Sequence, residues 1–499
     1  MREALLLVCT TCLYAFQAGA PAKFVITPEI QAAVEHVRAD SLRGDLAFLS
    51  SDLLEGRATP SRGLDIAAEY IAAQFRRAGI EPGGVDGYFQ SARLLVLETN
   101  MTGFELRLSH DKQSVTADPA DVIVSSNTAL DLKEAPILKL DLSDAAQVEE
   151  LTPGHVNGKV VLMELGRNGQ SNFRGLFQKL RQAKPAVLIT VARSTGGQRI
   201  SSEGVLTDPE EPRASTPRIT LIGPAGVAFY ESLGAGASGA TASLHLAAPH
   251  ETPVTPRNVA GVLRGSDTAL KDTYLLVTAH YDHLGKLPDG PGDRIFNGAN
   301  DDGSGTVSVI EVARALAPLK TRPRRSIVFM TFFGEEKGLM GSRYYAKHPL
   351  FPIDKTVGQL NLEQLGRTDD SEGARIATAT VTGFDYSTLT DSIQAAGELT
   401  GIKVFKHPKN SDLYFTASDN SSLAEAGVPA HTIAVTFQFP DYHGVGDEWQ
   451  KIDYDNLAKV DRMVTLATLM VANSDTPPRW NETNSKTKAF VKAWKDLHH

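Results

Sequence analysis

The chain has 499 residues, of which 42% are hydrophobic and 22% charged, a balance that excludes a collagen-like, low-complexity or wholly disordered protein. Its 50 Lys and Arg residues stand against 59 Asp and Glu residues, and the net charge of −9 excludes a general basic field for nucleic acid or an anionic membrane surface. No apolar run beyond residue 30 is long enough to predict a membrane span. We therefore expect a globular protein with no nucleic-acid partner and no membrane-spanning segment.

Residues 1–22 predict a signal peptide. A short charged lead precedes an apolar run over 4–16, small residues suited to cleavage follow, and a run of this length is too short to cross a bilayer. Both cysteines, Cys9 and Cys12, lie in this segment, so the mature chain would contain none. We expect a secreted or periplasmic protein that needs no disulfide.

Strands and helices alternate along much of the remaining chain. A helix is predicted over 64–78, where Ala67, Ile71 and Phe75 form one apolar face and Gly79 provides a stop. Further elements are predicted as strands over 274–278, 326–333, 357–362 and 430–437, and as helices over 306–316 and 338–346. Strands that are apolar on both faces and separated by helices indicate an α/β fold, with a mainly parallel mixed sheet covered by helices on both faces.

The stretch over 108–250 has a different character. Long loops rich in Gly, Ser and Pro separate a predicted strand at 158–165, a helix at 172–182 and a strand at 186–191. We expect a smaller domain inserted into a larger one. The predicted boundaries are a signal peptide over 1–22, a catalytic domain over 23–107 and 251–475, an insert over 108–250, and a tail over 476–499 that forms a docked helix.

Histidines and carboxylates recur where the predicted strands end. The strand at 274–278 runs into Ala279-His280-Tyr281-Asp282-His283. Because residues two apart on a strand face the same way, His280 can bind a metal while Asp282 orients its other ring nitrogen. A lone histidine at a strand end is more often a hydrogen-bonded structural residue, so the motif acquires meaning only from its companions.

Four companion segments stand at other strand or helix ends: Asn300-Asp301-Asp302-Gly303, Glu335-Glu336, Glu363, and Asp441-Tyr442-His443. The acidic turn before the helix at 306 suits a helix cap, but it lacks the Lys-Ser/Thr of a phosphate loop and the alternating carboxylates of a calcium loop. Adjacent Glu335 and Glu336 point apart, so one can bind metal while the other moves protons.

Ligands of open α/β sheets bind at the carboxyl ends of the strands, so these segments together predict one metal site. Two histidines and three carboxylates suit zinc better than calcium. Three carboxylates and one hydroxide also balance the charge of two zinc ions. The predicted metal ligands are His280, Asp301, Glu336, Glu363 and His443.

With these motifs the sequence resembles the co-catalytic di-zinc aminopeptidases, whose relatives include glutamate carboxypeptidase and glutaminyl cyclase. The resemblance covers most of 40–105 and 255–470, and the insert is similar to a protease-associated domain, a module thought to shape substrate access. The resemblance implies these roles: His280 and Glu363 on one zinc ion, Glu336 and His443 on the other, Asp301 bridging both and joined to Asp302 by a cis peptide, Glu335 as general base, and Tyr442 as a group that stabilises the oxyanion.

The chain departs from the family pattern at two positions. Glu363 stands where many members have Asp, which is one methylene shorter, and Asn420 stands where many have His. The resemblance implies a zinc-dependent exopeptidase that acts on peptides, in the first place an aminopeptidase. A carboxypeptidase with Arg343 or Arg367 on the terminal carboxylate, a glutaminyl cyclase with one zinc ion, and a binding module without activity are the alternatives. No oligomeric state is predicted.

Overall fold

The computed structural model describes residues 24–142, 144, 147, 149–164, 179–180, 182–193, 204–211, 216–288 and 290–498. The expected signal peptide over 1–22 and most of the expected helix over 172–182 lie outside these residues. Among the described residues, no helix combines the length and the apolar character needed to span a membrane.

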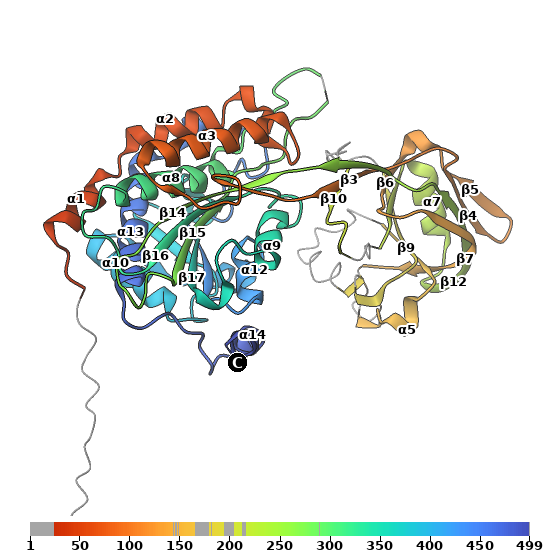
Figure 1. Ribbon diagram of the computed structural model, residues 1–499. Helices are drawn as coiled ribbons and strands as arrows, with labels where there is room; N and C mark the ends of the chain where they lie inside the picture. The colour runs from red at the N-terminus through yellow and green to blue at the C-terminus, as the bar shows by residue number, and fades with distance from the viewer. Residues whose placement is uncertain are drawn as a thin grey trace, which may run out of the picture.

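The main sheet lies at the centre of the larger of two bodies (Figure 1). Its strands are β1 (Glu81–Pro82), β2 (Phe89–Ser91), β14 (Arg257–Leu263), β15 (Tyr274–His280), β16 (Ser326–Phe332), β17 (Thr356–Leu362), β20 (Thr378–Val381), β21 (Lys403–Phe405) and β22 (Ala430–Ala434). They follow the order β1-β14-β16-β15-β17-β22-β20-β21, with β2 also paired to β14. The central strands β16, β15, β17 and β22 are parallel, whereas β14 and β20 are antiparallel to their inner neighbours.

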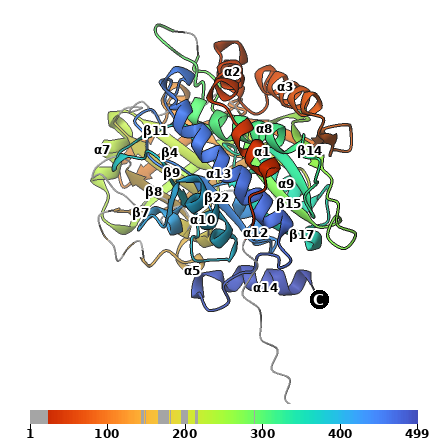
Figure 2. The same ribbon diagram turned by 90° about the vertical axis from the view of Figure 1, so that its left-hand side faces the viewer.

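Helices cover both faces of this sheet (Figures 1 and 2). One face carries α1 (Pro28–His36), α2 (Ala39–Leu49), α3 (Arg62–Ala78), α8 (Gly305–Leu316), α10 (Leu389–Thr400) and α13 (Tyr454–Asn473). The other face carries α9 (Met340–Lys347), α12 (Asn420–Glu425) and α14 (Lys488–Leu497). A short helix, α11 (Asn410–Leu413), precedes α12. The predicted α/β fold with a mainly parallel, doubly covered sheet is confirmed.

Strand geometry divides the apolar side chains between two cores. On β15, Leu275, Val277 and Ala279 pack on the side of α8, whereas Tyr274 and Leu276 pack on the side of α9. This is the alternation that a pleated strand imposes. Every residue of β15 is buried, which explains why the sequence there is apolar, apart from Thr278, until His280.

The helix α3 follows directly from its residue pattern. Ser61 accepts a hydrogen bond from the amide of Leu64 at the amino end, and Gly79 ends the helix in the left-handed conformation with φ 77°. A residue with a Cβ atom adopts that conformation only at a cost, so glycine is favoured there. The predicted helix over 64–78 therefore differs from α3 only at its start.

His431 is a buried polar residue of β22. Its ring lies 2.6 Å from the hydroxyl of Ser387 through Nε2 and 2.7 Å from the carbonyl of Thr382 through Nδ1. Burial lowers the pKa of His431 to about 4. The imidazole is therefore held neutral inside the sheet, where the charged form would lose its hydration.

The smaller body is built on a second sheet. Its strands are β4 (Glu105–His110), β5 (Gln113–Thr116), β6 (Val122–Ser125), β7 (Leu130–Leu140), β8 (Val160–Glu164), β9 (Val187–Ala192), β11 (Arg218–Ile222) and β12 (Gly236–Leu246). They follow the order β5-β4-β12-β7-β8-β9-β11-β6 and pack with α5 (Pro153–Val156) and α7 (Pro224–Ser232) around cores of their own. The expected boundary at 108 falls inside β4, so the smaller body begins earlier than the loop composition suggests.

A narrow sheet joins the two bodies. Its strands are β3 (Leu94–Glu98), β10 (Val205–Thr207) and β13 (His250–Val254), in the order β10-β3-β13. Beyond β10 the chain reaches α9 of the larger body, where Glu211 lies 2.7 Å from Arg343 and Asp208 lies 3.1 Å from Lys347. Ion pairs therefore tie the smaller body to the helix that follows the Glu335-Glu336 loop.

Candidate active site

The predicted ligands come from separate loops at one edge of the main sheet. His280 is the last residue of β15, Glu363 follows β17, and Glu336 follows β16 after a tight turn at Gly334. Asp301 lies in the helical turn Ala299–Ser304 that leads into α8, and His443 follows β22 with φ 54°. The central strands are parallel, so their carboxyl ends place these side chains together.

Two groups of possible ligands share Asp301. In the first, one atom each of His280, Asp301 and Glu363 lie within 4.8 Å of one another. In the second, atoms of His283, Asp301 and Glu336 lie equally close. His443 approaches the second group, with its Nε2 3.0 Å from Asp301 Oδ2 and 3.3 Å from Glu336 Oε1. The structure thus brings all five predicted ligands together and adds His283, whose Nδ1 is 2.9 Å from Glu336 Oε1.

These residues fit a pair of bound cations. Several of their polar atoms are buried and make no hydrogen bond within the described residues: His280 Nε2, both ring nitrogens of His283, Glu336 Oε1 and Glu363 Oε2. Such atoms are costly unless something satisfies them. Imidazole nitrogens and carboxylate oxygens form the donor set that zinc takes in proteins.

Negative charge is concentrated here away from water. Burial raises the pKa of Glu363 to about 7, and burial together with Glu363 and Glu336 raises the pKa of Glu335. Burial lowers the pKa of His443, but the carboxylates of Asp301 and Glu336 outweigh it and raise the value to about 10. A metal cation placed among these carboxylates would stabilise their charged forms.

Two further carboxylates hold the ligand loops by their backbone. Asp302 accepts hydrogen bonds from the amides of His280 at 3.2 Å and Gly305 at 3.1 Å, and Asp447 accepts from those of Asn300 and Asp301 at 2.9 to 3.0 Å. The peptide between Asp301 and Asp302 is cis, as the resemblance implies. These contacts fix where the shared carboxylate of Asp301 lies.

Asp282 serves two neighbours. The Nδ1 atom of His280 lies 3.2 Å from the backbone oxygen of Asp282 and 3.6 Å from its carboxylate, so the backbone makes the closer contact with the ring. The carboxylate instead accepts a hydrogen bond from the amide of Glu335 at 3.0 Å. Asp282 therefore links the histidine at the end of β15 to the loop that carries Glu335.

Glu335 and Tyr442 lie beside the ligands. Glu335 Oε2 is 4.0 Å from His280 Nε2, and 12% of the Glu335 side chain is exposed, so solvent reaches it. The ring of Tyr442 stacks on that of His443 at 4.0 Å, and the residue is 45% exposed. Desolvation and the carboxylates of Asp301 and Glu336 raise the pKa of Tyr442, so its hydroxyl remains a hydrogen-bond donor at neutral pH.

The two arginines considered for a substrate carboxylate are engaged elsewhere. Arg343 donates to Glu211 of the smaller body at 2.7 Å. Arg367 donates to Asp369 at 2.6 Å and 2.7 Å, and to Asp441 at 2.9 Å. Both guanidinium groups thus have carboxylate partners within the protein.

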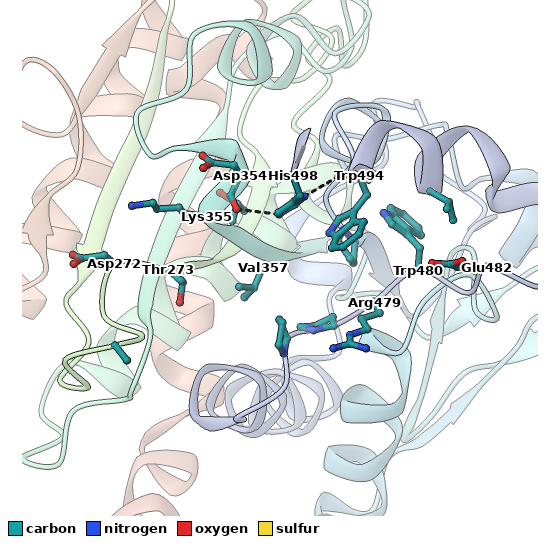
Figure 3. A pocket seen from close by; sticks show the side chains of 16 residues that line it. Asp272, Thr273, Asp354, Lys355, Val357, Arg479, Trp480, Glu482, Trp494 and His498 are labelled. Atoms are coloured by element: carbon teal, nitrogen blue, oxygen red, sulfur yellow. Dashed lines mark hydrogen bonds between the residues drawn. The ribbon is translucent and has the colours of Figure 1, made fainter. Parts of the chain in front are cut away.

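A separate cavity of about 850 Å³ lies at the opposite end of the central strands (Figure 3). It is lined by residues that precede β15, β17 and β22, and by Trp480, Trp494 and His498 of the tail. His498 contacts the carbonyl oxygens of Asp354 and Trp494 on its wall. The amino ends of the strands form this cavity, so it is distinct from the ligand cluster.

Residues 258–468, which contain every predicted ligand, match the model of peptidase family M28. This part of the chain is similar to that family. This segment begins at β14 and ends within α13, so it includes the central strands and excludes the smaller body. The resemblance to co-catalytic zinc aminopeptidases is confirmed.

Curated relatives match parts of the chain. Aminopeptidase YwaD of Bacillus subtilis is 26% identical over 244 residues, which cover 48% of the chain and 50% of the relative. A probable zinc metalloprotease of Leptosphaeria maculans is 36% identical over 128 residues, or 25% of the chain and 27% of the relative. The chain therefore spans half or less of the length of these relatives.

Solved structures share the fold over more of the chain. The aminopeptidase from Aneurinibacillus sp. strain AM-1 superposes with a TM-score of 0.59 at 20% identity, covering 91% of this chain and 97% of that one. A zinc aminopeptidase from Bacillus subtilis gives a TM-score of 0.53 at 20% identity, covering 87% and 95%. At these identities the likeness shows a common fold.

Proposed function

We propose that this protein is an exported di-zinc aminopeptidase that removes residues from the amino ends of peptides. The observation that carries the proposal is the pair of ligand groups sharing Asp301, with buried ligand atoms that make no hydrogen bond in the part of the chain that the structure describes. The match of residues 258–468 to the M28 family model and the likeness to proteins named as aminopeptidases support it. Export is supported by the signal-peptide pattern over 1–22.

His280 and Glu363 would hold one zinc ion, Glu336 and His443 the other, and Asp301 both. His283 is a further candidate for the second ion because it contacts the same oxygen of Glu336 as His443 does. When bound, the two ions would polarise the scissile carbonyl and lower the pKa of the attacking water.

The chain's own residues supply the proton transfers. Glu335 would accept the proton of the attacking water and deliver it to the departing amine. Asp282 would keep the backbone of Glu335 in place through the 3.0 Å hydrogen bond described above. The Tyr442 hydroxyl, kept protonated, would donate a hydrogen bond to the oxyanion that develops on the carbonyl oxygen.

An aminopeptidase fits the surroundings better than a carboxypeptidase. A carboxypeptidase needs a cation for the terminal carboxylate of its substrate, and the guanidinium groups of Arg343 and Arg367 are already paired within the protein. A free α-amine, by contrast, would find carboxylates in the cluster. A binding module without activity is disfavoured because all five ligands and Glu335 are present together.

The proposal is tested on purified protein with metal content measured in the same sample. We expect about two zinc ions per chain, cleavage of aminoacyl chromogenic substrates, no cleavage of the same substrates when the amine is acetylated, and loss of activity on chelation. Release of carboxyl-terminal residues would favour the carboxypeptidase. One zinc ion with cyclisation of amino-terminal glutamine would favour the cyclase. A metal-free preparation with full activity would contradict the proposal.

A further inference from the structure

Arg57 lies buried beneath the ligand loops, outside the segment that matches the family model. It ends the short helical segment Asp52–Arg57, which follows α2, and only 1% of the residue is exposed. A fully buried arginine is unusual, because charged residues are seldom fully buried unless their charge is compensated.

The guanidinium group of Arg57 binds carbonyl oxygens from three parts of the chain. Its Nε donates to Tyr281 at 2.8 Å, and its two Nη atoms donate to Asn297 at 2.8 Å and Gly298 at 2.9 Å. One Nη also donates to the carbonyl of Leu49 at the end of α2. Tyr281 stands next to His280, and Gly298 is three residues before Asp301, so one side chain ties the two loops that carry these ligands.

The backbone beside Arg57 adds cross-links to the same loops. The carbonyl of Arg57 accepts from the amide of His283 at 3.2 Å, and the carbonyl of Gly56 accepts from that of Gly285 at 3.0 Å. A Cβ atom on Gly56 would collide with the carbonyl oxygens of Gly285 and Phe296, and the residue has φ 69°. Only glycine allows this close approach, so Gly56 lets the segment before Arg57 pack directly against the backbone at Gly285 and Phe296.

The charge of Arg57 is balanced at a distance. Burial lowers its pKa to about 10, while the carboxylates of Asp282 and Asp447 oppose the fall, so the group remains charged at neutral pH. A planar guanidinium offers five donors in a fixed arrangement, which matches carbonyls lying on several sides. A lysine ammonium at this place would keep the charge but offer three donors from a single atom.

We infer that Arg57 is a positioning residue: it holds the His280–His283 segment and the Asn297–Asp301 segment at a fixed separation, so that the ligand cluster keeps its shape before a metal binds. This inference rests on the metal centre in the proposed function. Residues that support ligands from outside the coordination sphere typically change metal affinity or activity 10- to 100-fold when replaced.

The test compares Arg57→Lys with a matched control, Arg325→Lys. Arg325 is also buried, at 2% exposed, and also donates to carbonyl oxygens, those of Val471 and Ser474. It precedes β16, however, at the end of the strand opposite to Glu335 and Glu336. Both variants lose a buried guanidinium and keep a positive charge, but only Arg57→Lys disturbs the ligand loops.

We expect Arg57→Lys to weaken zinc binding about 10- to 100-fold in a competition titration with a chelator. The rise in melting temperature that zinc produces should shrink by a corresponding amount, since a ligand stabilises the folded state according to its affinity. Arg325→Lys should lower the melting temperature of the zinc-free and zinc-loaded forms alike and leave zinc affinity unchanged. At saturating zinc, Arg57→Lys should lower kcat with little change in KM.

Hydrogen exchange of the zinc-free wild-type protein tests the same inference without a variant, should Arg57→Lys not fold. The amides at 281–285 and 297–301 should be protected before zinc is added, because the protein already fixes them. Exchange that is unprotected until zinc binds would overturn the inference. So would Arg57→Lys protein that binds zinc as tightly as wild type, in which case the proposed function still stands. Wild-type protein that binds no zinc would instead contradict the proposed function itself.

Discussion

Replacing Glu335 by glutamine separates proton transfer from metal binding. Glutamine keeps the size of the side chain and the backbone hydrogen bond to Asp282, but it cannot accept a proton from water. Loss of a general base typically costs about 10²- to 10⁴-fold in rate, equivalent to about 3 to 5 kcal/mol in the activation free energy. Glu335 Oε2 is 4.0 Å from His280 Nε2 and belongs to neither ligand group, so zinc content should stay at the wild-type value. The loss should therefore appear in kcat.

Glu336→Gln is the control, because Glu336 is adjacent to Glu335 and its side chain has the same size and the same charge. Glu336 Oε1 contacts both His283 and His443, so this change should lower zinc occupancy before it lowers the rate of fully loaded protein. Steady-state kinetics with metal analysis of each sample distinguishes the two effects. If Glu335→Gln loses zinc while Glu336→Gln retains it, the two roles are reversed. If both variants keep near wild-type activity, the hydrolase mechanism is wrong.

His283→Ala and His443→Ala should each weaken the binding of one zinc ion, because both rings contact Glu336. Metal titration identifies the stronger ligand, and unchanged affinity in both variants would exclude a metal at this group. Tyr442→Phe should lower kcat about 10²-fold through loss of one donor to the oxyanion, with zinc content unchanged, and an unaltered kcat would remove Tyr442 from the mechanism. Folding lowers the pKa of His431 from its ordinary value near 6.5 to about 4. Between these two pH values the unfolded chain binds a proton that the folded chain does not. The free energy of unfolding therefore falls by up to about 3 kcal/mol as the pH drops from 6.5 to 4. Between pH 7 and 4.5, the free energy of unfolding of zinc-free His431→Gln should thus fall by about 2 to 3 kcal/mol less than that of zinc-free wild type. Urea unfolding measures this, followed by the fluorescence of Trp480, whose ring centroid lies 6.0 Å from that of His431. Parallel pH profiles of the two proteins would contradict the prediction.

The sequence predicts the central strands well because burial on both faces makes them rich in apolar residues and excludes Asp, Glu, Lys and Arg from them. The runs at 274–278 and 357–362 give β15 and β17 to within two residues. The run at 430–437 predicts too long a strand: β22 ends at Ala434, because the amides of Val435 and Thr436 turn to the carbonyl of Gln364. An apolar run predicts that residues are buried, but it does not predict where strand pairing ends.

The ligand cluster is predictable because parallel strands bring their carboxyl ends to one edge. His283 escapes this reasoning because β15 ends at His280, and alternation along a strand says nothing of a side chain in the turn that follows. A second histidine three residues after the first is the signal that points to it. Arg57 escapes for a different reason: it is 224 residues from Tyr281, and Glu55-Gly56-Arg57 has the composition of an exposed turn.

Because β3 pairs with β13, the DNA segment that encodes the smaller body can be removed without separating the strands that flank it. Leu94 lies opposite Val254 and Glu98 opposite His250, so β3 and β13, the strands by which the chain enters and finally leaves the smaller body, are neighbouring antiparallel strands. Such a pair has the geometry of a hairpin, and a turn of a few residues closes it without moving either strand. Recombination at this neck can therefore remove or exchange the intervening module in one event, because the seam that it leaves is already a folded element.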